Sequence, residues 1–147
     1  MQIKELGHVV LYVTNLTRSA DFYRDTLGFH ELSRGAGTAL YSSGRTHHEL
    51  LLIEIGGVPK SKHTIEPGLY HIGFKIGDSD EELRSAHREL LAKGITIVGI
   101  GDHTVTHSLY ILDPDGNELE LYVDTTDLWK SEPDLIMRPV KHLDLGE

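Results

Sequence analysis

A carboxylate and a phenol, Glu120 and Tyr110, are predicted to face each other across a β-hairpin. Runs of mostly alternating polar and apolar residues flank a turn at 113–117 that contains Pro, Gly and Asn, which predicts two antiparallel strands. If Leu112 pairs with Glu118 across the turn, Tyr110 pairs with Glu120, and their Cβ atoms lie about 5 Å apart on one face. A buried carboxylate needs a partner, and the ten histidines of the chain could share such a site through a metal ion.

Two of those histidines, His8 and His71, occupy equivalent places in a sequence that repeats. The order strand, helix, strand, strand, strand is predicted twice, over about 3–56 and 69–124, and each histidine comes early in the first strand of its copy. Neither copy would close a core alone. We therefore predict one α+β domain over residues 1–124, in which two βαβββ repeats pair their mixed sheets into a half-barrel or cup.

Each predicted helix has residues typical of helix ends. Asn15 is placed to cap the first helix, and Gly28 to end it. Ser79 and Glu82 form a capping box before the second helix, which Gly94 ends. The predicted strands are 6–13, 29–33, 38–42 and 48–55 in the first copy, and 69–76, 95–100, 104–112 and 118–123 in the second.

The composition is that of an ordinary globular protein and excludes several partners. The chain has 147 residues, 39% hydrophobic and 25% charged, enough for one domain with a core. Its net charge of −9 argues against nucleic acid and against an anionic membrane surface, and no apolar run approaches transmembrane length. There is no cysteine and no apolar leader after Met1, so we expect a cytoplasmic protein without disulfides.

The last segment, 125–147, leaves the repeat. It holds Trp129, two prolines and mixed charge, and we predict that it docks as a lid or a dimer arm. A free tail is the alternative. Because the strand edges of a half-barrel are exposed unless something covers them, we expect a homodimer.

Residues 3–124 resemble the vicinal oxygen chelate superfamily, which includes glyoxalases, bleomycin-resistance proteins, fosfomycin-resistance enzymes and extradiol ring-cleaving dioxygenases. The resemblance implies three metal ligands: His8 in Leu-Gly-His-Val, His71 in Leu-Tyr-His-Ile-Gly-Phe, and Glu120 in Asp-Pro-Asp-Gly-Asn-Glu-Leu-Glu. Two histidines and a carboxylate form a facial triad that leaves open positions and suits Fe(II). Mn(II), Ni(II) or Zn(II) could also bind these ligands.

Three further residues favour the dioxygenase branch. His48 matches the catalytic histidine of these enzymes, Tyr110 matches their active-site tyrosine, and His103 resembles a further histidine of the site. The resemblance therefore implies an Fe(II)-dependent extradiol dioxygenase that opens a small catechol-type ring with dioxygen. The glyoxalase branch normally has a glutamate where this chain has a histidine, whereas the fosfomycin-resistance branch shares the His-His-Glu set.

Other interpretations stay open. The chain could be a glyoxalase-like isomerase, a fosfomycin-type thiol transferase, or a non-catalytic binding protein of the bleomycin-resistance kind. A one-residue slip would turn His47 rather than His48 inward, and a lone strand histidine is more often a hydrogen-bonded core residue than a ligand. The remaining histidines are assigned to the surface or to packing: His30, His63, His87, His107 and His142.

Overall fold

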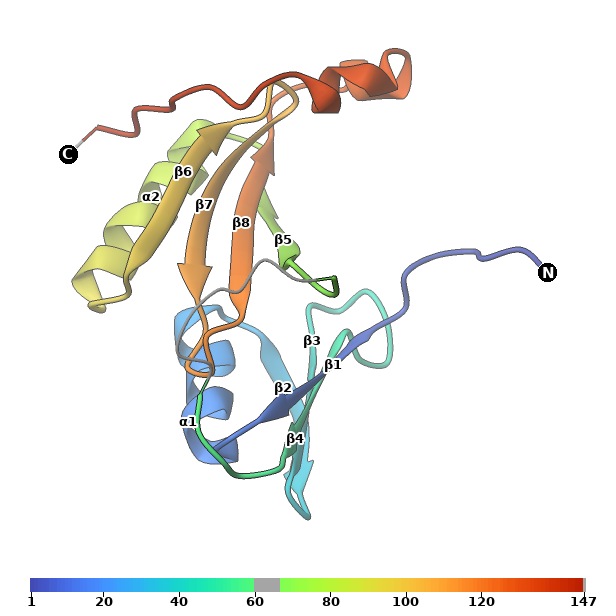
Figure 1. Cartoon of the computed structure of the whole chain (residues 1–147), viewed down its shortest axis with the longest axis vertical. Helices are drawn as coiled ribbons and strands as arrows, with labels where there is room; N and C mark the ends of the chain where they lie inside the picture. Colours follow the sequence, from blue (N-terminus) through green and yellow to red (C-terminus); the bar gives the residue numbers. More distant parts are fainter. Residues whose placement is uncertain (60–66, 147) are drawn as a thin grey trace. The chain divides into compact units, whose positions relative to one another are not determined.

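The chain folds as two α+β units, each with its own four-stranded mixed sheet (Figure 1). The structure, a computed structural model, describes residues 1–59 and 67–146. The first unit holds residues 1–59 and the turn Asp113–Gly116, and the second holds 67–112 and 117–146. In chain order, each unit contributes a strand, a helix and three more strands, and the four strands form its sheet. The α+β class and both βαβββ repeats are thereby confirmed.

The first unit has a sheet in the order β1-β4-β3-β2, in which β1 runs parallel to β4 and the other neighbours are antiparallel. The helix packs on β3 and β4, where Ala20, Tyr41 and Leu52 are fully buried. The elements are β1 (Val9–Val13), α1 (Leu16–Asp21), the π-helical turn η1 (Phe22–Thr26), β2 (His30–Gly35), β3 (Thr38–Ser42) and β4 (Leu50–Glu54).

The predicted ends of the first helix are confirmed. The side chain of Asn15 accepts a hydrogen bond from the backbone N–H of Arg18 at 2.8 Å, which satisfies one of the free donors at the helix start. Gly28, just after the helix, adopts φ +74°, a conformation that favours glycine. The backbone N–H of Leu27 bonds to the carbonyl of Phe22 at 3.2 Å, so the last turn is wider than an α-helical turn.

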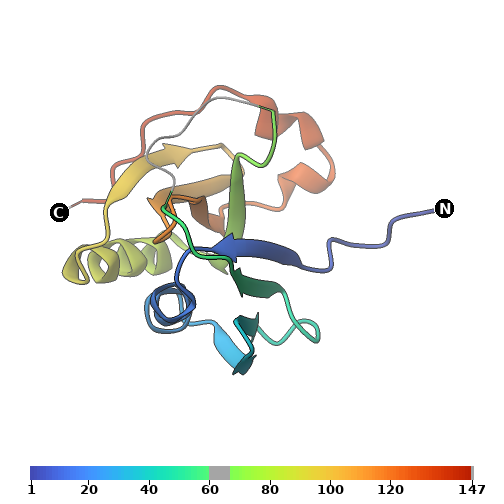
Figure 2. The same cartoon turned by 60° about the horizontal axis from the view of Figure 1, so that its bottom comes forward.

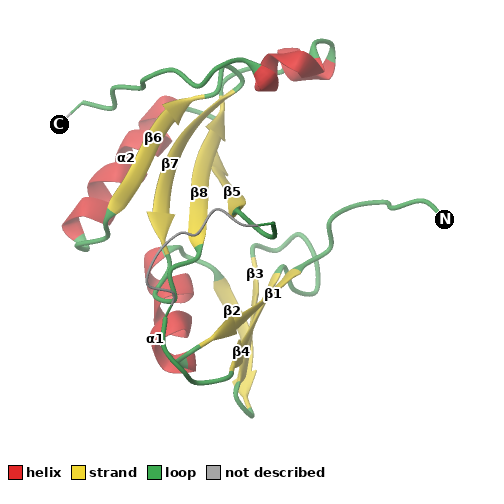
Figure 3. Cartoon of the chain, viewed as in Figure 1, coloured by secondary structure: helices red, strands yellow, loops and turns green. Residues whose placement is uncertain are grey.

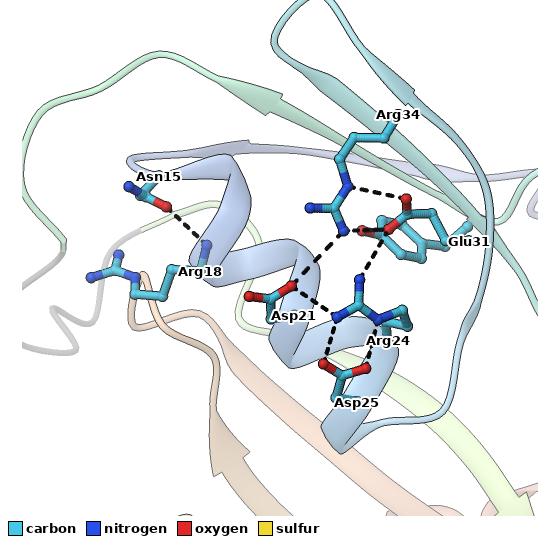
Figure 4. A network of polar contacts seen from close by, with 8 residues as sticks. Asn15, Arg18, Asp21, Arg24, Asp25, Glu31 and Arg34 are labelled. Carbon is cyan, nitrogen blue, oxygen red and sulfur yellow. Dashed lines mark hydrogen bonds and ion pairs between the residues drawn. The ribbon is translucent and has the colours of Figure 1, made fainter.

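A network of ion pairs joins the helix to β2 (Figure 4). Arg24 pairs with Asp21 at 3.0 Å and with Asp25 at 2.6 Å, and lies 3.9 Å from Glu31. Arg34 in turn binds Glu31 through two nitrogen–oxygen contacts. All five side chains are partly or largely exposed, so the network adds modestly to stability and indicates no ligand site.

The second unit has a sheet in the order β5-β8-β7-β6, with α2 lying along one face (Figure 2). On β8, Leu119, Leu121 and Val123 are buried, whereas Glu118 and Glu120 alternate with them on the other face. The elements are β5 (His71–Gly77), α2 (Asp80–Ala92), β6 (Ile97–Asp102), β7 (Thr106–Leu112) and β8 (Glu118–Asp124).

The predicted hairpin register is confirmed. Leu112 pairs with Glu118, and Tyr110 pairs with Glu120. The predicted cap of α2 is present: the Ser79 side chain accepts the backbone N–H of Glu82. The Glu82 carboxylate reaches back to the backbone N–H of Asp78 at 2.9 Å, one residue before the position that a capping box uses.

Most predicted strands begin one to three residues later than expected, and for two of them this changes the place of a predicted site residue. β1 begins at Val9, so His8 precedes the strand instead of lying on it, and β4 begins at Leu50, so His48 lies in the preceding connection. Before β1, the guanidinium of Arg45 donates to the carbonyls of Leu6 and Gly7 at 3.2 and 3.0 Å, so these carbonyls have a side-chain partner where a longer strand was expected.

The tail carries two short 3-10 helices, η2 (Leu128–Lys130) and η3 (Pro133–Met137), shown in Figure 3. Beyond them, Lys141 forms two backbone hydrogen bonds with Asp102 at the end of β6, at 3.0 and 2.9 Å. In the described part of the chain, no helix has the length and apolar character needed to cross a membrane.

Candidate functional site

In the second unit the structure brings together two of the predicted metal ligands. His71 begins β5, and Glu120 lies on the neighbouring parallel strand β8. The His71 Nε2 atom is 3.1 Å from Glu120 Oε2. Gly73 is the register partner of Glu120, and a Cβ atom there would lie 3.4 Å from Oε2. A side chain at position 73 would therefore be in van der Waals contact with the Glu120 carboxylate.

The separation of these two atoms fits a shared metal ion. Adjacent ligands in a six-coordinate site with bonds of about 2.1 Å lie about 3 Å apart, close to the 3.1 Å between His71 and Glu120. The other ring nitrogen of His71, Nδ1, is buried without a hydrogen-bond partner in the described part of the chain, and Glu118 Oε1 is 3.8 Å away. A histidine ligand commonly directs its second nitrogen toward a carboxylate in this way.

Tyr110 and His103 lie beside the same carboxylate. The Tyr110 hydroxyl donates to Glu120 Oε1 at 2.9 Å, and its oxygen is 2.7 Å from His103 Nε2. Burial raises the pKa of Tyr110 far above its usual range, and the hydrogen bond and charge of Glu120 act in the same direction. The phenol therefore keeps its proton. Since that proton goes to Glu120, His103 Nε2 is the donor in the contact with Tyr110.

Sequence reasoning missed a fourth group at this carboxylate, Ser108. Its hydroxyl donates to Glu120 Oε1 at 2.7 Å, and the residue is fully buried. The period of two along a strand places Ser108 on the same face as Tyr110, and that was the signal available in the sequence.

In the first unit three histidine rings lie close together. The ring of His48 is 4.4 Å from that of His8 and 4.5 Å from that of His47, measured between centroids. The Nδ1 atoms of His47 and His48 are 2.6 Å apart, so one ring donates a hydrogen bond to the other. Desolvation, followed by the charges of His8 and His47, lowers the pKa of His48.

A carboxylate organises the connection that carries these rings. Glu49 accepts hydrogen bonds from the backbone N–H of Ser43, from its hydroxyl at 2.7 Å and from Ser42 at 3.2 Å. Arg45 donates to Glu49 at 3.1 Å and also to the carbonyls beside His8. Arg45 therefore links the 43–49 connection to the His8 segment.

The predicted site residues divide between the two units. His8 and His48 belong to the first unit, and His71, His103, Tyr110 and Glu120 belong to the second. Among residues 1–59 and 67–146 there is no group of three His, Asp or Glu side chains that could hold a metal. Of the other histidines, His107 bonds Asp80 at 2.6 Å, His30 and His142 are exposed, His87 is half-buried, and His63 lies outside the described residues.

Comparisons with known proteins identify the same family. Catechol-2,3-dioxygenase of Bacillus subtilis is 34% identical over 119 residues, which cover 81% of this chain and 41% of that protein. Biphenyl-2,3-diol 1,2-dioxygenase 2 of Rhodococcus globerulus is 31% identical over 82% of this chain and 63% of its own length. Metallothiol transferase FosB of Staphylococcus epidermidis is 33% identical over 82% of this chain and 84% of its own length. The chain thus spans less than two thirds of either dioxygenase.

Solved structures share the fold. A glyoxalase/dioxygenase from Nostoc punctiforme aligns with a TM-score of 0.71 at 21% identity, covering 84% of this chain and 92% of that one. A lactoylglutathione lyase from Agrobacterium tumefaciens aligns with a TM-score of 0.63 at 21% identity, covering 84% of this chain and 96% of that one. The sequence model of one family matches residues 5–121. The chain belongs to the Glyoxalase/Bleomycin resistance protein/Dioxygenase superfamily.

Proposed function

We propose that the chain is a metal-dependent extradiol dioxygenase acting on a catechol-type substrate, with His8, His71 and Glu120 as ligands of Fe(II). The observation that carries the proposal is the group around Glu120: His71 Nε2 lies 3.1 Å from Glu120 Oε2, and Tyr110 is bonded both to Glu120 and to His103. His103 is not a proposed ligand, and its contact with Tyr110 supports a role in handling a substrate. Two relatives named as dioxygenases of aromatic diols support the same chemistry.

The metal, when bound, would lower the pKa of the substrate hydroxyls and provide a binding position for dioxygen. Mn(II), Ni(II) or Zn(II) also fit two histidines and a carboxylate. The contributions of the protein itself come from the three side chains that are not ligands.

His48 is proposed as the acid–base group. Its ring packs against His8 and is held by the contact with His47, so a substrate bound next to His8 would lie near it. It would take a proton from a substrate hydroxyl and return one as the ring opens. Tyr110 would orient the substrate by accepting a hydrogen bond from a substrate hydroxyl, because its own proton goes to Glu120. His103 would hold Tyr110 in place by donating to the same phenol oxygen.

The first test measures oxygen uptake and the absorbance of ring-opened product, using the Fe(II)-loaded protein and a panel of catechols in air. His48→Ala should retain iron, because His48 is not a ligand, while turnover falls on the order of 10²-fold or more. Tyr110→Phe should lose less, since one hydrogen bond is removed. If the wild type consumes no oxygen with any catechol, the dioxygenase proposal fails; if His48→Ala loses iron, His48 is a ligand.

A second candidate is a metal-dependent thiol transferase. It is favoured by one observation: the relative named metallothiol transferase is matched over 84% of its length, against 41% for catechol-2,3-dioxygenase. The same ligands would serve. Loss of free thiol in the presence of fosfomycin and Mn(II), without oxygen consumption, would establish this activity instead.

A further inference from the structure

The two oxygens of Glu120 have different surroundings. Oε1 accepts hydrogen bonds from Ser108 at 2.7 Å and from Tyr110 at 2.9 Å. Oε2 is 3.1 Å from His71 Nε2. A carboxylate oxygen has two lone pairs, so the two donors occupy both acceptor positions of Oε1. The protein therefore binds one oxygen of Glu120 and directs the other toward His71.

The Ser108 side chain is built into this arrangement. Ser108 is fully buried, and its hydroxyl needs a partner inside the protein. That partner is Glu120 Oε1, and Ser108 lies two positions along β7 from Tyr110, which pairs with Glu120. Ser108 lies on β7, which pairs with a strand on each side, so its backbone is held in place. Its hydroxyl therefore fixes the orientation of the Glu120 carboxylate about its last side-chain bond.

Binding through one oxygen of Glu120 matters because it determines how many coordination positions of the metal stay open. A facial triad on a six-coordinate ion leaves three positions open. A substrate that binds through two oxygens, together with one dioxygen, would use all three. A glutamate that bound through both oxygens would take one of them.

We propose that Ser108 is a positioning residue that, with Tyr110, makes Glu120 a ligand through Oε2 alone. This inference rests on the proposed metal site. It goes beyond that site by assigning a role to a buried serine. Tyr110, in this role, acts on Glu120 before any substrate is present.

The test uses Mn(II) alone, with free ion measured by electron paramagnetic resonance. Ser108→Ala should bind Mn(II) at least about tenfold more weakly, the usual scale for losing a group that holds a ligand. Ser19→Ala is the matched control, because Ser19 is another buried serine that donates to a carboxylate, Asp115 at 3.2 Å. That control should bind within about twofold of the wild type.

A second readout addresses the one-oxygen ligand directly. In ¹⁷O-enriched water, the broadening of the electron paramagnetic resonance lines of Mn(II) bound to the wild-type protein counts the water molecules on the ion. Three bound waters are expected, and two would overturn the inference. The melting temperature of each metal-free variant verifies folding. If Ser108→Ala does not fold, Tyr110→Phe removes the other donor to Oε1 and should also weaken binding.

The outcomes separate the inference from the proposed function. If the wild type binds Mn(II), Glu120→Gln abolishes binding, and Ser108→Ala binds as tightly as the wild type or more tightly, only the role of Ser108 is overturned. If the wild type does not bind Mn(II), or Glu120→Gln binds it equally well, the proposed metal site falls, and this inference with it.

Discussion

At the scale of single residues, carboxylates with several donors organise both halves of the chain. Glu120 and Glu49 each collect hydrogen bonds from two or more side chains, and each lies next to histidines. The hydrogen bonds to the two carboxylates position different parts of the chain. Those to Glu120 hold a predicted ligand, whereas those to Glu49 hold the connection that carries His48.

Glu49 should make stability depend on pH. Burial would raise its pKa, but hydrogen bonds from Ser43, Ser42 and Arg45 outweigh burial and lower it below 4.5. A lowered folded-state pKa contributes stability that is present above about pH 4.5 and is lost as pH falls through the folded-state value. Glu49→Gln should therefore lower the free energy of unfolding at pH 7 by on the order of 1–2 kcal/mol.

Urea unfolding at pH 7 and at about pH 3 measures this effect. The difference between Glu49→Gln and wild type should shrink at the lower pH. Glu132→Gln, at an exposed position, is the control and should show no such change between the two pH values. An equal deficit of Glu49→Gln at both pH values would contradict the prediction.

At the scale of elements, the turn between β7 and β8 makes its contacts with the first unit. Asp115 is buried and accepts hydrogen bonds from Thr14, from Ser19 at 3.2 Å and from Arg18 at 3.0 Å. Asp113, also buried, accepts the hydroxyl of Tyr23 at 2.8 Å. The turn thus completes the polar contacts of α1.

Removing the Asp115 carboxylate should therefore destabilise the chain strongly. Asp115→Ala would leave several donors without an acceptor, and we expect a loss of about 2–3 kcal/mol in the free energy of unfolding. Asp127→Ala is the control, since Asp127 is exposed and pairs with Lys130 at 2.8 Å. It should change stability by less than about 0.5 kcal/mol. Similar losses in both variants, measured by urea unfolding, would refute the assignment.

At the scale of the whole molecule, a metal bound by the proposed ligands His8, His71 and Glu120 would stabilise the folded chain. With free Mn(II) at about 100 times Kd, binding should add about 2.7 kcal/mol to stability. For a chain of this size, that raises Tm by about 5–10 °C. Calorimetry should show the gain in the wild type, its loss on adding a chelator, and its absence in Glu120→Gln. No gain in the wild type would count against the proposed ligands. The homodimer stays a prediction.

Much of the fold could be predicted because local signals fixed it. The length of the turn at 113–117 sets which residues face each other across the hairpin. Leu112 therefore pairs with Glu118, and Tyr110 with Glu120. The beginning of β1 after His8 could not be predicted, because the side chain of Arg45, distant in sequence, binds the carbonyls of Leu6 and Gly7. Alternation placed Ser108 on the face of Tyr110, but it could not show that Ser108 is fully buried. That depends on neighbouring strands and not on the local sequence.

The assignment of the β7–β8 turn to the first unit has a consequence for the order in which the protein matures during synthesis. The ribosome delivers residues 1–59 first, yet the acceptors for Thr14, Ser19 and Tyr23 are Asp113 and Asp115. A nascent chain that has not reached residue 115 therefore lacks the partners of these groups. Synthesis supplies the last hydrogen bonds of the N-terminal unit only after β5, α2, β6 and β7 have been made.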